Sequence, residues 1–153
     1  MKKTIGTVIL LFLLCGFVKN SATVISPGYS GITDTIPVAL PANFMDDYGI
    51  KYAISDTLWF QLPSAKYHII RWNMKEQYLV AKNGAANPGD GGLYTRIDYM
   101  HFKNMEPFLW GFCLSTFNAK SDSLAEFSPV NIDRLNPRKG CNGYPFSRMK
   151  KVD

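Results

Sequence analysis

The sequence predicts a mainly β domain: an antiparallel meander that forms a curled sheet or a small barrel-like sheet, with one short late helix. Short alternations of apolar and polar residues recur along the chain and are separated by turn residues. They are rich in the aromatic residues that strands favour. A helical pattern occurs once, late in the chain, so the helical crossovers that a parallel sheet needs are missing.

Residues 1–22 have the pattern of a secretory signal peptide. A basic start precedes an apolar run from Ile5 to Leu14, and small residues end the segment at Ala22. The run is shorter than the roughly 20 residues of a membrane-spanning helix. We therefore expect a secreted or periplasmic protein with no transmembrane segment in the mature chain. A lipid anchor on Cys15 is the alternative, although bulky Leu14 stands where lipoprotein signals have a small residue.

Three further segments are expected after the signal peptide. Residues 23–45 are rich in Ser, Thr, Gly and Pro and show no sustained period, which is typical of an extended leader. The β domain is expected over residues 46–149. Residues 150–153 form the end of a basic tail. At 153 residues and 46% hydrophobic residues, the chain has enough apolar surface for one core.

Five or six strands are expected within the β domain. Most show alternation with a period of two, and turn residues separate them. Residues 73–76 have the length of a hairpin turn, and the Gly-, Pro- and Asn-rich stretch 83–92 reads as a loop. The expected strands are 50–54, 58–62, 67–72, 78–82, 94–102 and 108–117.

One helix is expected over residues 118–127. Ser121 or Asp122 can cap its start, and Pro129 stops it. Leu124 and Phe127 would provide a small apolar face. The chain beyond residue 133 is rich in turn residues.

Two cysteines remain once the signal peptide is removed, and we expect them to form a disulfide. An even pair of cysteines in an oxidising compartment is typical of a bridge. A catalytic Cys113 would need an exposed site with a base, whereas Phe112 and Leu114 beside it indicate a well-packed strand. A Cys113–Cys141 bridge would hold the turn-rich tail on that strand.

Three motifs resemble those of an uncharacterised group of small secreted or lipid-anchored bacterial β-rich proteins. YTRIDY at 94–99, CL at 113–114 and GCNGYPFS at 140–147 are similar to that group's YSRFDW, CQ and GCxGFxWS. The resemblance covers roughly residues 48–149, and it implies location and fold but carries no activity. Its most specific parts are Arg96, Asp98, Cys113 and Cys141, and the chain departs from it at Ile97, Tyr99, Leu114 and Phe146.

Arg96 and Asp98 are two residues apart in a strand, so they share one face and can contact each other. The simpler interpretation is an ion pair that orders this face. Alternatively, Arg96 holds an anionic group of a ligand while Asp98 fixes the guanidinium, a task that suits the planar fork of arginine.

Strand aromatics are numerous, and most should lie in the core. If the sheet curls without a covering helix, one face would form an aromatic concavity that suits a small apolar or sugar-like ligand. The candidate ligand-binding residues are Arg96, Asp98, Trp59, Trp72, Trp110 and Tyr94.

His68 and His101 are the only histidines, and a zinc site would need at least one further ligand near them. The sequence contains no nucleophile elbow or positioned triad. We therefore expect no catalytic site, no metal and no cofactor. A small secreted hydrolase that uses Arg96, Asp98 and a histidine remains the alternative.

The formal charge of +5 is concentrated outside the expected strands. Six basic residues and two acidic residues follow residue 132, while residues 23–132 carry eight basic against ten acidic residues. A basic tail with Tyr144 and Phe146 could bind phosphate, an anionic lipid or a polysaccharide, although such tails more often form a solvated surface without a ligand. Export and the modest charge of the mature chain argue against a nucleic-acid partner.

These observations favour an exported binding or structural module of the bacterial cell envelope or extracellular space. Its partner would be a small-molecule ligand or an envelope polysaccharide. The sequence does not indicate the oligomeric state.

Overall fold

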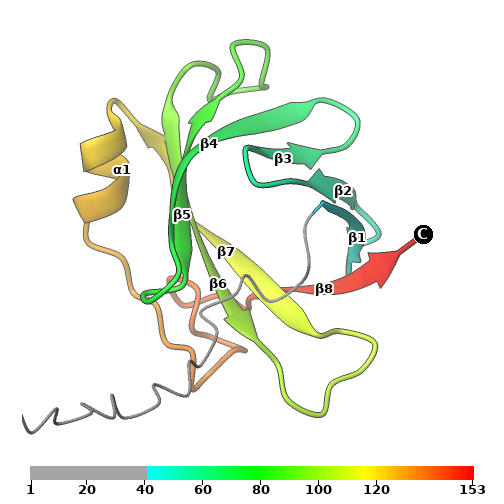
Figure 1. Ribbon diagram of the computed structural model, residues 1–153. Coiled ribbons are helices and arrows are strands. Elements are labelled where there is room, and N and C mark those ends of the chain that lie inside the picture. Colours follow the sequence, from blue (N-terminus) through cyan, green and yellow to red (C-terminus); the bar gives the residue numbers. More distant parts are fainter. Residues whose placement is uncertain (1–40) are drawn as a thin grey trace, which may run out of the picture. The chain divides into compact units, whose positions relative to one another are not determined.

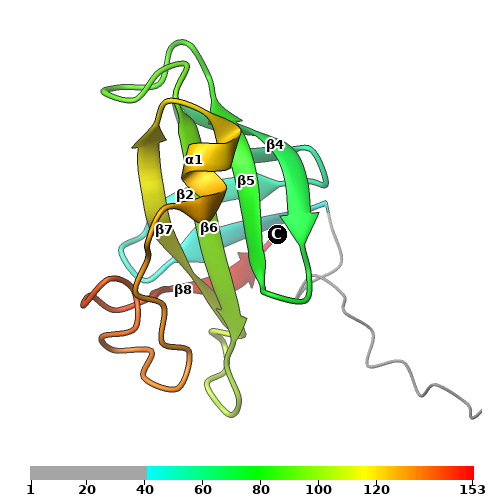
Figure 2. The same cartoon turned by 90° about the vertical axis from the view of Figure 1, so that its left-hand side faces the viewer.

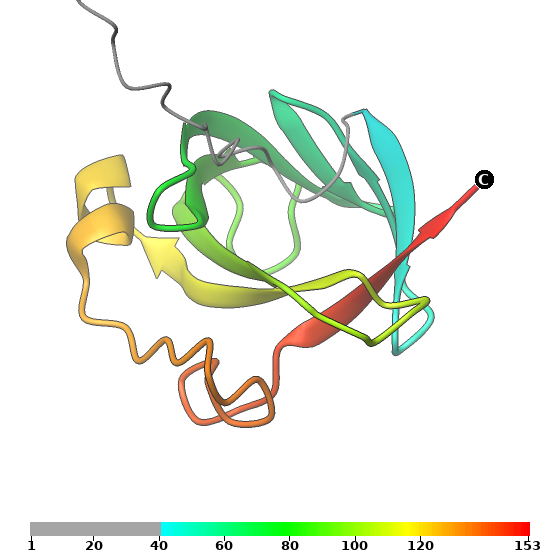
Figure 3. The same ribbon diagram turned by 60° about the horizontal axis from the view of Figure 1, so that its bottom comes forward.

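The computed structural model describes residues 41–153, which form eight antiparallel strands closed into a barrel (Figure 1). Each strand pairs with the next in sequence, and β8 closes the ring by pairing with β1 (Figure 3). The expected mainly β, antiparallel fold with one short helix is confirmed. The strands are β1 (Ala42–Asp46), β2 (Lys51–Ile54), β3 (Leu58–Gln61), β4 (Ala65–Asn73), β5 (Tyr78–Asn83), β6 (Tyr94–His101), β7 (Trp110–Ala119) and β8 (Ser147–Val152).

The expected limits of the β domain were too narrow at both ends. β1 begins in the stretch predicted to be leader, and β8 extends into residues predicted to be the end of a tail. Each strand points one large apolar side chain, Phe44 or Met149, into the core. Only one large apolar residue per strand lies inward, and in β1 the apolar Met45 follows Phe44 directly, so neither strand shows a clear period-two pattern. The predicted signal peptide, Cys15 and leader residues 23–40 lie outside the described residues.

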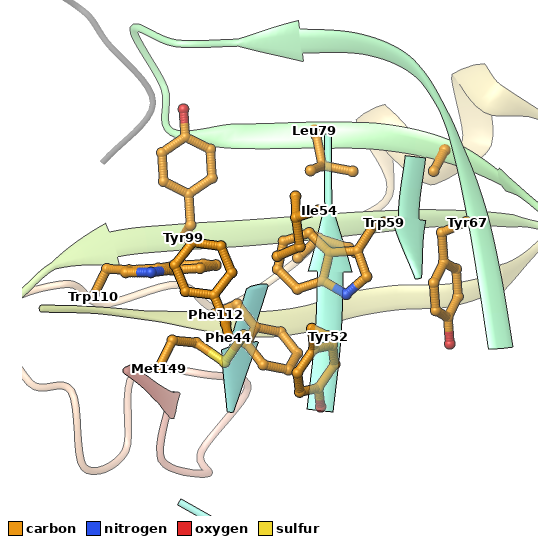
Figure 4. Packing of buried hydrophobic residues seen from close by; sticks show 12 residues of the cluster. Phe44, Tyr52, Ile54, Trp59, Tyr67, Leu79, Tyr99, Trp110, Phe112 and Met149 are labelled. Carbon is orange, nitrogen blue, oxygen red and sulfur yellow. The ribbon is translucent and has the colours of Figure 1, made fainter. Parts of the chain in front are cut away.

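The barrel interior is filled by side chains, as is usual when eight strands close. Trp59 lies at its centre, with its ring edge-on to those of Trp110 and Phe112 at centroid distances of 5.8 and 5.0 Å (Figure 4). Such edge-to-face contacts are the favoured geometry for aromatic pairs. The buried interior residues are Phe44, Tyr52, Ile54, Trp59, Tyr67, Leu79, Ala81, Ile97, Tyr99, Trp110, Phe112 and Met149.

A β-bulge in β4 keeps its aromatic residues directed inward. The register with β5 shifts between Ile69 and Arg71, which leaves Ile70 as the extra residue. Trp72 then pairs with Leu79 and packs against the interior cluster. Without this extra residue, the alternation would turn Trp72 to the outer face.

The helix α1 (Asp122–Phe127) lies on the outer face of β5, β6 and β7 (Figure 2). Ser121 caps it, because its side chain accepts a hydrogen bond from the Leu124 backbone N–H at 3.1 Å. The helix starts later than expected because β7 continues to Ala119. The expected apolar face is wrong: Phe127 is 78% exposed and Leu124 is 54% exposed, while Ala125 is buried.

The Cys113–Cys141 disulfide is present, with the two Cα atoms 5.5 Å apart. Cys113 is buried on the outer face of β7, where it packs with Met100 and Phe146. The bridge therefore fixes the irregular segment 128–146 on the barrel wall, as the sequence predicted. Among residues 41–153, no helix is long and apolar enough to cross a membrane.

Candidate functional site

Arg96 and Asp98 form a two-pronged ion pair on the outer face of β6. Arg96 Nε donates to Asp98 Oδ2 at 2.8 Å, and Nη2 donates to Oδ1 at 3.0 Å. Arg96 Nη1 donates to the Glu126 carbonyl at 2.8 Å, and the guanidinium lies 4.0 Å from the ring centroid of Tyr78. All three nitrogens therefore already donate to the protein, so this guanidinium is poorly placed to hold an anionic ligand.

Asp98 is fully buried and has two more partners. Arg134 Nη2 donates to Asp98 Oδ1 at 3.0 Å, and the Ser115 hydroxyl donates to Oδ2. Arg134 also donates to three backbone carbonyls, those of Glu76, Gln77 and Tyr99. Asp98 thus joins the 128–146 segment, β6 and β7, which matches the simpler of the two interpretations of the pair.

A second polar cluster holds α1 on the barrel. Arg71 Nε donates to Glu126 Oε2 at 3.0 Å, and Arg71 Nη1 donates to Asp122 Oδ2 at 3.0 Å. The Tyr78 hydroxyl donates to Glu126 Oε1 at 2.7 Å. These hydrogen bonds, that from Arg71 foremost, lower the pKa of Glu126. Because the helix docks through its acidic side, Leu124 and Phe127 face away from the barrel.

The four aromatic candidates do not line one concave surface. Trp59 and Trp110 are buried in the interior. Trp72 is half-buried and donates from its indole nitrogen to the Asp56 carbonyl at 2.8 Å. Tyr94 lies on the outer wall, packed against the cluster beneath α1, with the Lys82 ammonium 5.8 Å from its ring centroid.

The two histidines do not join the Arg96–Asp98 pair. His68 and His101 are both exposed, on β4 and β6, and neither is a hydrogen-bond partner of Asp98. In the described part of the chain, no group of three or more His, Cys, Asp or Glu side chains could hold a metal ion. The convergence in an open cleft that a hydrolase of this kind needs is not seen there.

A groove lies outside the barrel, between the loop that joins β6 to β7 and the disulfide-held segment. Its cavity measures about 410 Å³, a volume typical of small-ligand sites. We call it the Arg148 groove. Its lining residues are Asp47, Phe102, Met105, Pro137, Arg138, Pro145, Phe146 and Arg148.

Arg148 is held in a defined direction within this groove. Its Nε donates to Asp47 Oδ2 at 2.8 Å, and its backbone N–H donates to Asp47 Oδ1 at 3.2 Å. Its guanidinium carbon lies 4.8 Å from the ring centroid of Phe108. Asp47 and Phe108 together thus orient the guanidinium, while the Arg148 side chain remains 45% exposed. Sequence reasoning missed this residue, and its only signal was the cluster of basic and aromatic residues near the C-terminus.

A second hollow of about 560 Å³ lies against β1, β2 and β8. Lys51 and Asp153 contribute opposite charges to its lining, and Tyr52, which also lines it, donates its hydroxyl to Asp46 Oδ2 at 2.9 Å. Among residues 41–153, however, no hydrogen bond fixes a charged side chain of this lining as Asp47 fixes Arg148. The Arg148 groove is therefore the better candidate for a specific ligand.

Comparison of the chain with protein families, curated proteins and solved structures found no match. The site is therefore interpreted from its own geometry.

Proposed function

We propose that the protein is an exported binding module of the bacterial cell envelope or extracellular space and that it holds a small ligand in the Arg148 groove. The observation that carries this proposal is the oriented guanidinium of Arg148 beside a mostly apolar cavity of about 410 Å³. A few fixed polar groups in an apolar concavity are characteristic of ligand sites.

The barrel itself suits the role of a rigid scaffold. Its interior is occupied by packed aromatic rings, so a ligand there would have to displace side chains such as Trp59 and Phe112. The groove walls, in contrast, come from segments outside the barrel, and the Cys113–Cys141 bridge fixes one of them. Rigid walls reduce the entropy that binding must overcome.

Export is supported by the signal-peptide pattern and by the disulfide, since disulfides persist mainly in oxidising compartments. Mass spectrometry of the protein purified from its own host should give a mature chain that starts near Thr23, without an acyl group and with no free thiol. A diacylated Cys15 at the N-terminus would instead show that the exported protein is anchored to a membrane. A full-length reduced chain would contradict export altogether.

The binding role can be tested with a fragment library and backbone amide chemical shifts of the oxidised protein. We expect hits to shift the amides of groove residues such as Phe102, Phe146 and Arg148. Tryptophan fluorescence should change little, because Trp59 and Trp110 lie inside the barrel. Chemical-shift changes centred on the interior residues would place the ligand site inside the barrel. If no fragment shifts the groove amides, the proposal is contradicted.

A further inference from the structure

We infer that the ligand of the Arg148 groove carries a single carboxylate on a compact apolar or sugar-like body. This inference rests on the proposed function and specifies the chemical class of its ligand. Three features of the groove support it: the balance of its charges, the direction of the Arg148 fork and the composition of its walls.

The charge balance favours one negative charge on the ligand. The charged side chains that line the groove are two arginines, Arg138 and Arg148, and one acid, Asp47. Their sum of about +1 can be neutralised by one carboxylate. A dianionic phosphate would place its second charge near Asp47, and like charges a few ångströms apart repel each other.

The fork of Arg148 suits a planar two-oxygen group. Asp47 accepts a hydrogen bond from Nε, and within residues 41–153 neither Nη1 nor Nη2 donates a hydrogen bond. These two nitrogens can bind both oxygens of a carboxylate at once. The Asp47 bond and the Phe108 ring together orient the fork before a ligand arrives.

The walls suit a compact, weakly polar body. Phe102 and Met105 come from the β6–β7 loop, and Pro137, Pro145 and Phe146 come from the disulfide-held segment. Flat proline and phenylalanine faces can pack against the C–H face of a sugar ring or against a short hydrocarbon. The Phe146 backbone N–H donates to the Pro137 carbonyl at 2.9 Å, which holds the two ends of the second wall together.

The test is a titration of the oxidised protein, followed by isothermal calorimetry and amide chemical shifts. Sodium glucuronate and sodium hexanoate are the two carboxylate probes, and they distinguish a sugar-like body from a hydrocarbon body. Glucose and 1-hexanol are their neutral counterparts, and glucose 6-phosphate is the dianion. We expect at least one carboxylate to bind about tenfold more tightly than its neutral counterpart and than the phosphate.

Charge-removing variants assign the effect to the groove. Arg148→Met should weaken carboxylate binding about tenfold, and Arg138→Met should weaken it severalfold. Lys139→Met is the matched control, because it removes one positive charge beside Arg138 from an exposed residue outside the lining. It should change the affinity by less than about twofold, since solvent screens an exposed charge that does not line the groove. Unchanged melting temperatures will show that all three variants are folded.

The outcomes separate the inference from the proposed function. A neutral probe that binds the groove as tightly as its carboxylate supports the binding module but overturns the carboxylate inference. Tighter binding of the phosphate, or full affinity in Arg148→Met, also overturns it. If no probe and no library fragment shifts the groove amides, both the inference and the proposed function fail.

Discussion

The inside of the barrel and the outer face of β5–β7 are stabilised in different ways. The interior cluster consists of large apolar side chains, with Trp59 at its centre. The outer face carries two small apolar clusters, around Val80 and around Cys113, and the charged network of Asp98 lies in the same region. Inside the barrel, burial of apolar surface is the main source of stability. Outside, specific polar contacts and a disulfide hold the covering segments on the barrel.

This difference shows where each kind of interaction is needed. When eight strands close into a barrel, apolar side chains of the right total volume can fill the interior. A six-residue helix and an irregular segment bury little apolar surface, so they need other means to stay docked. Substitutions inside the barrel should therefore lower stability by removing packed side-chain volume. Substitutions outside should lower it by leaving charges unpaired or by releasing the loop that the disulfide closes.

The largest effect is expected inside the barrel. Trp59→Ala removes the central ring and should lower the free energy of unfolding by about 3 to 5 kcal/mol, as large-to-small core substitutions do. Phe60→Ala is the matched control on the same strand, because Phe60 is half-buried on the opposite face. Urea denaturation of both variants measures the difference. Equal losses would show that the interior does not dominate stability.

The next effect concerns the covalent bond outside. Replacing Cys113 and Cys141 together with alanine releases a loop whose ends are 28 residues apart. The chain-entropy relation gives about 3.6 kcal/mol for such a loop, and strain or residual structure in the unfolded chain reduces this value. Thermal melting of the variant, and of the wild type with reductant, should show the loss. An unchanged melting temperature after verified reduction would contradict a stabilising role.

A comparable but smaller effect is expected for the buried carboxylate. Asp98→Ala leaves Arg96 and Arg134 without their shared acceptor and should cost about 3 kcal/mol. Removing Arg96 as well should restore about 1 kcal/mol of this loss, because one of the two stranded charges disappears. Denaturant titrations of both single variants and the double variant form the cycle. Strictly additive losses would show that the residues act independently.

Local patterns in the sequence were sufficient for much of the fold. Alternation indicated most of the six expected strands, Ser121 was one of the two residues expected to cap the helix, and the two remaining cysteines predicted the disulfide. The sequence left a curled sheet and a barrel-like sheet both open, because closure depends on pairs such as Asn43 with Val152, far apart in sequence. A pattern with a period of two describes one strand and says nothing about which distant strand lies beside it.

The candidate site was less predictable for the same reason. Arg96 and Asp98 were recognisable because they are two residues apart on one strand. The partners that decide their role, Ser115 and Arg134, come from other segments. The contact of Arg148 with Asp47 likewise spans 101 positions. Such contacts depend on tertiary structure, so a single sequence offered only the clustering of basic and aromatic residues.

A smaller effect is expected where α1 docks, and it should depend on pH. The lowered pKa of Glu126 means that its ionised form is favoured in the folded protein. The resulting stabilisation is present above the ordinary glutamate pKa of about 4.3 and is lost as the pH falls through the lower folded-state value. Because Arg71 keeps 34% of its side chain exposed, solvent screening limits the contribution to about 1 kcal/mol.

The variant Glu126→Gln measures this contribution. Its deficit in unfolding free energy relative to the wild type should be present at pH 7 and should shrink towards pH 3. Glu76→Gln is the control, because Glu76 is an exposed acid with no side-chain ion pair among the described residues. A deficit for Glu126→Gln that stays constant with pH would show that the loss comes from packing of the helix, not from its charge.

The smallest effect is expected at an interior residue, Trp110. No group in the described part of the chain accepts a hydrogen bond from its buried indole N–H, and an unpartnered buried donor costs about 1 to 3 kcal/mol. Trp110→Phe loses some packing but also removes this donor, so the two terms should nearly cancel and the net change should stay within about 1 kcal/mol.

Phe112→Leu is the matched control, because it lies two residues further along β7, is also buried in the interior and carries no donor. It should cost about 1 to 2 kcal/mol through lost volume alone, which makes the replacement of the larger Trp110 ring the milder change. Urea denaturation of the two variants decides the comparison. A loss above about 2 kcal/mol for Trp110→Phe would mean that the indole N–H makes a favourable contact inside the barrel. The interior would then depend on this polar contact in addition to the hydrogen bond from Tyr52 to Asp46, and the contrast with the outer face would weaken.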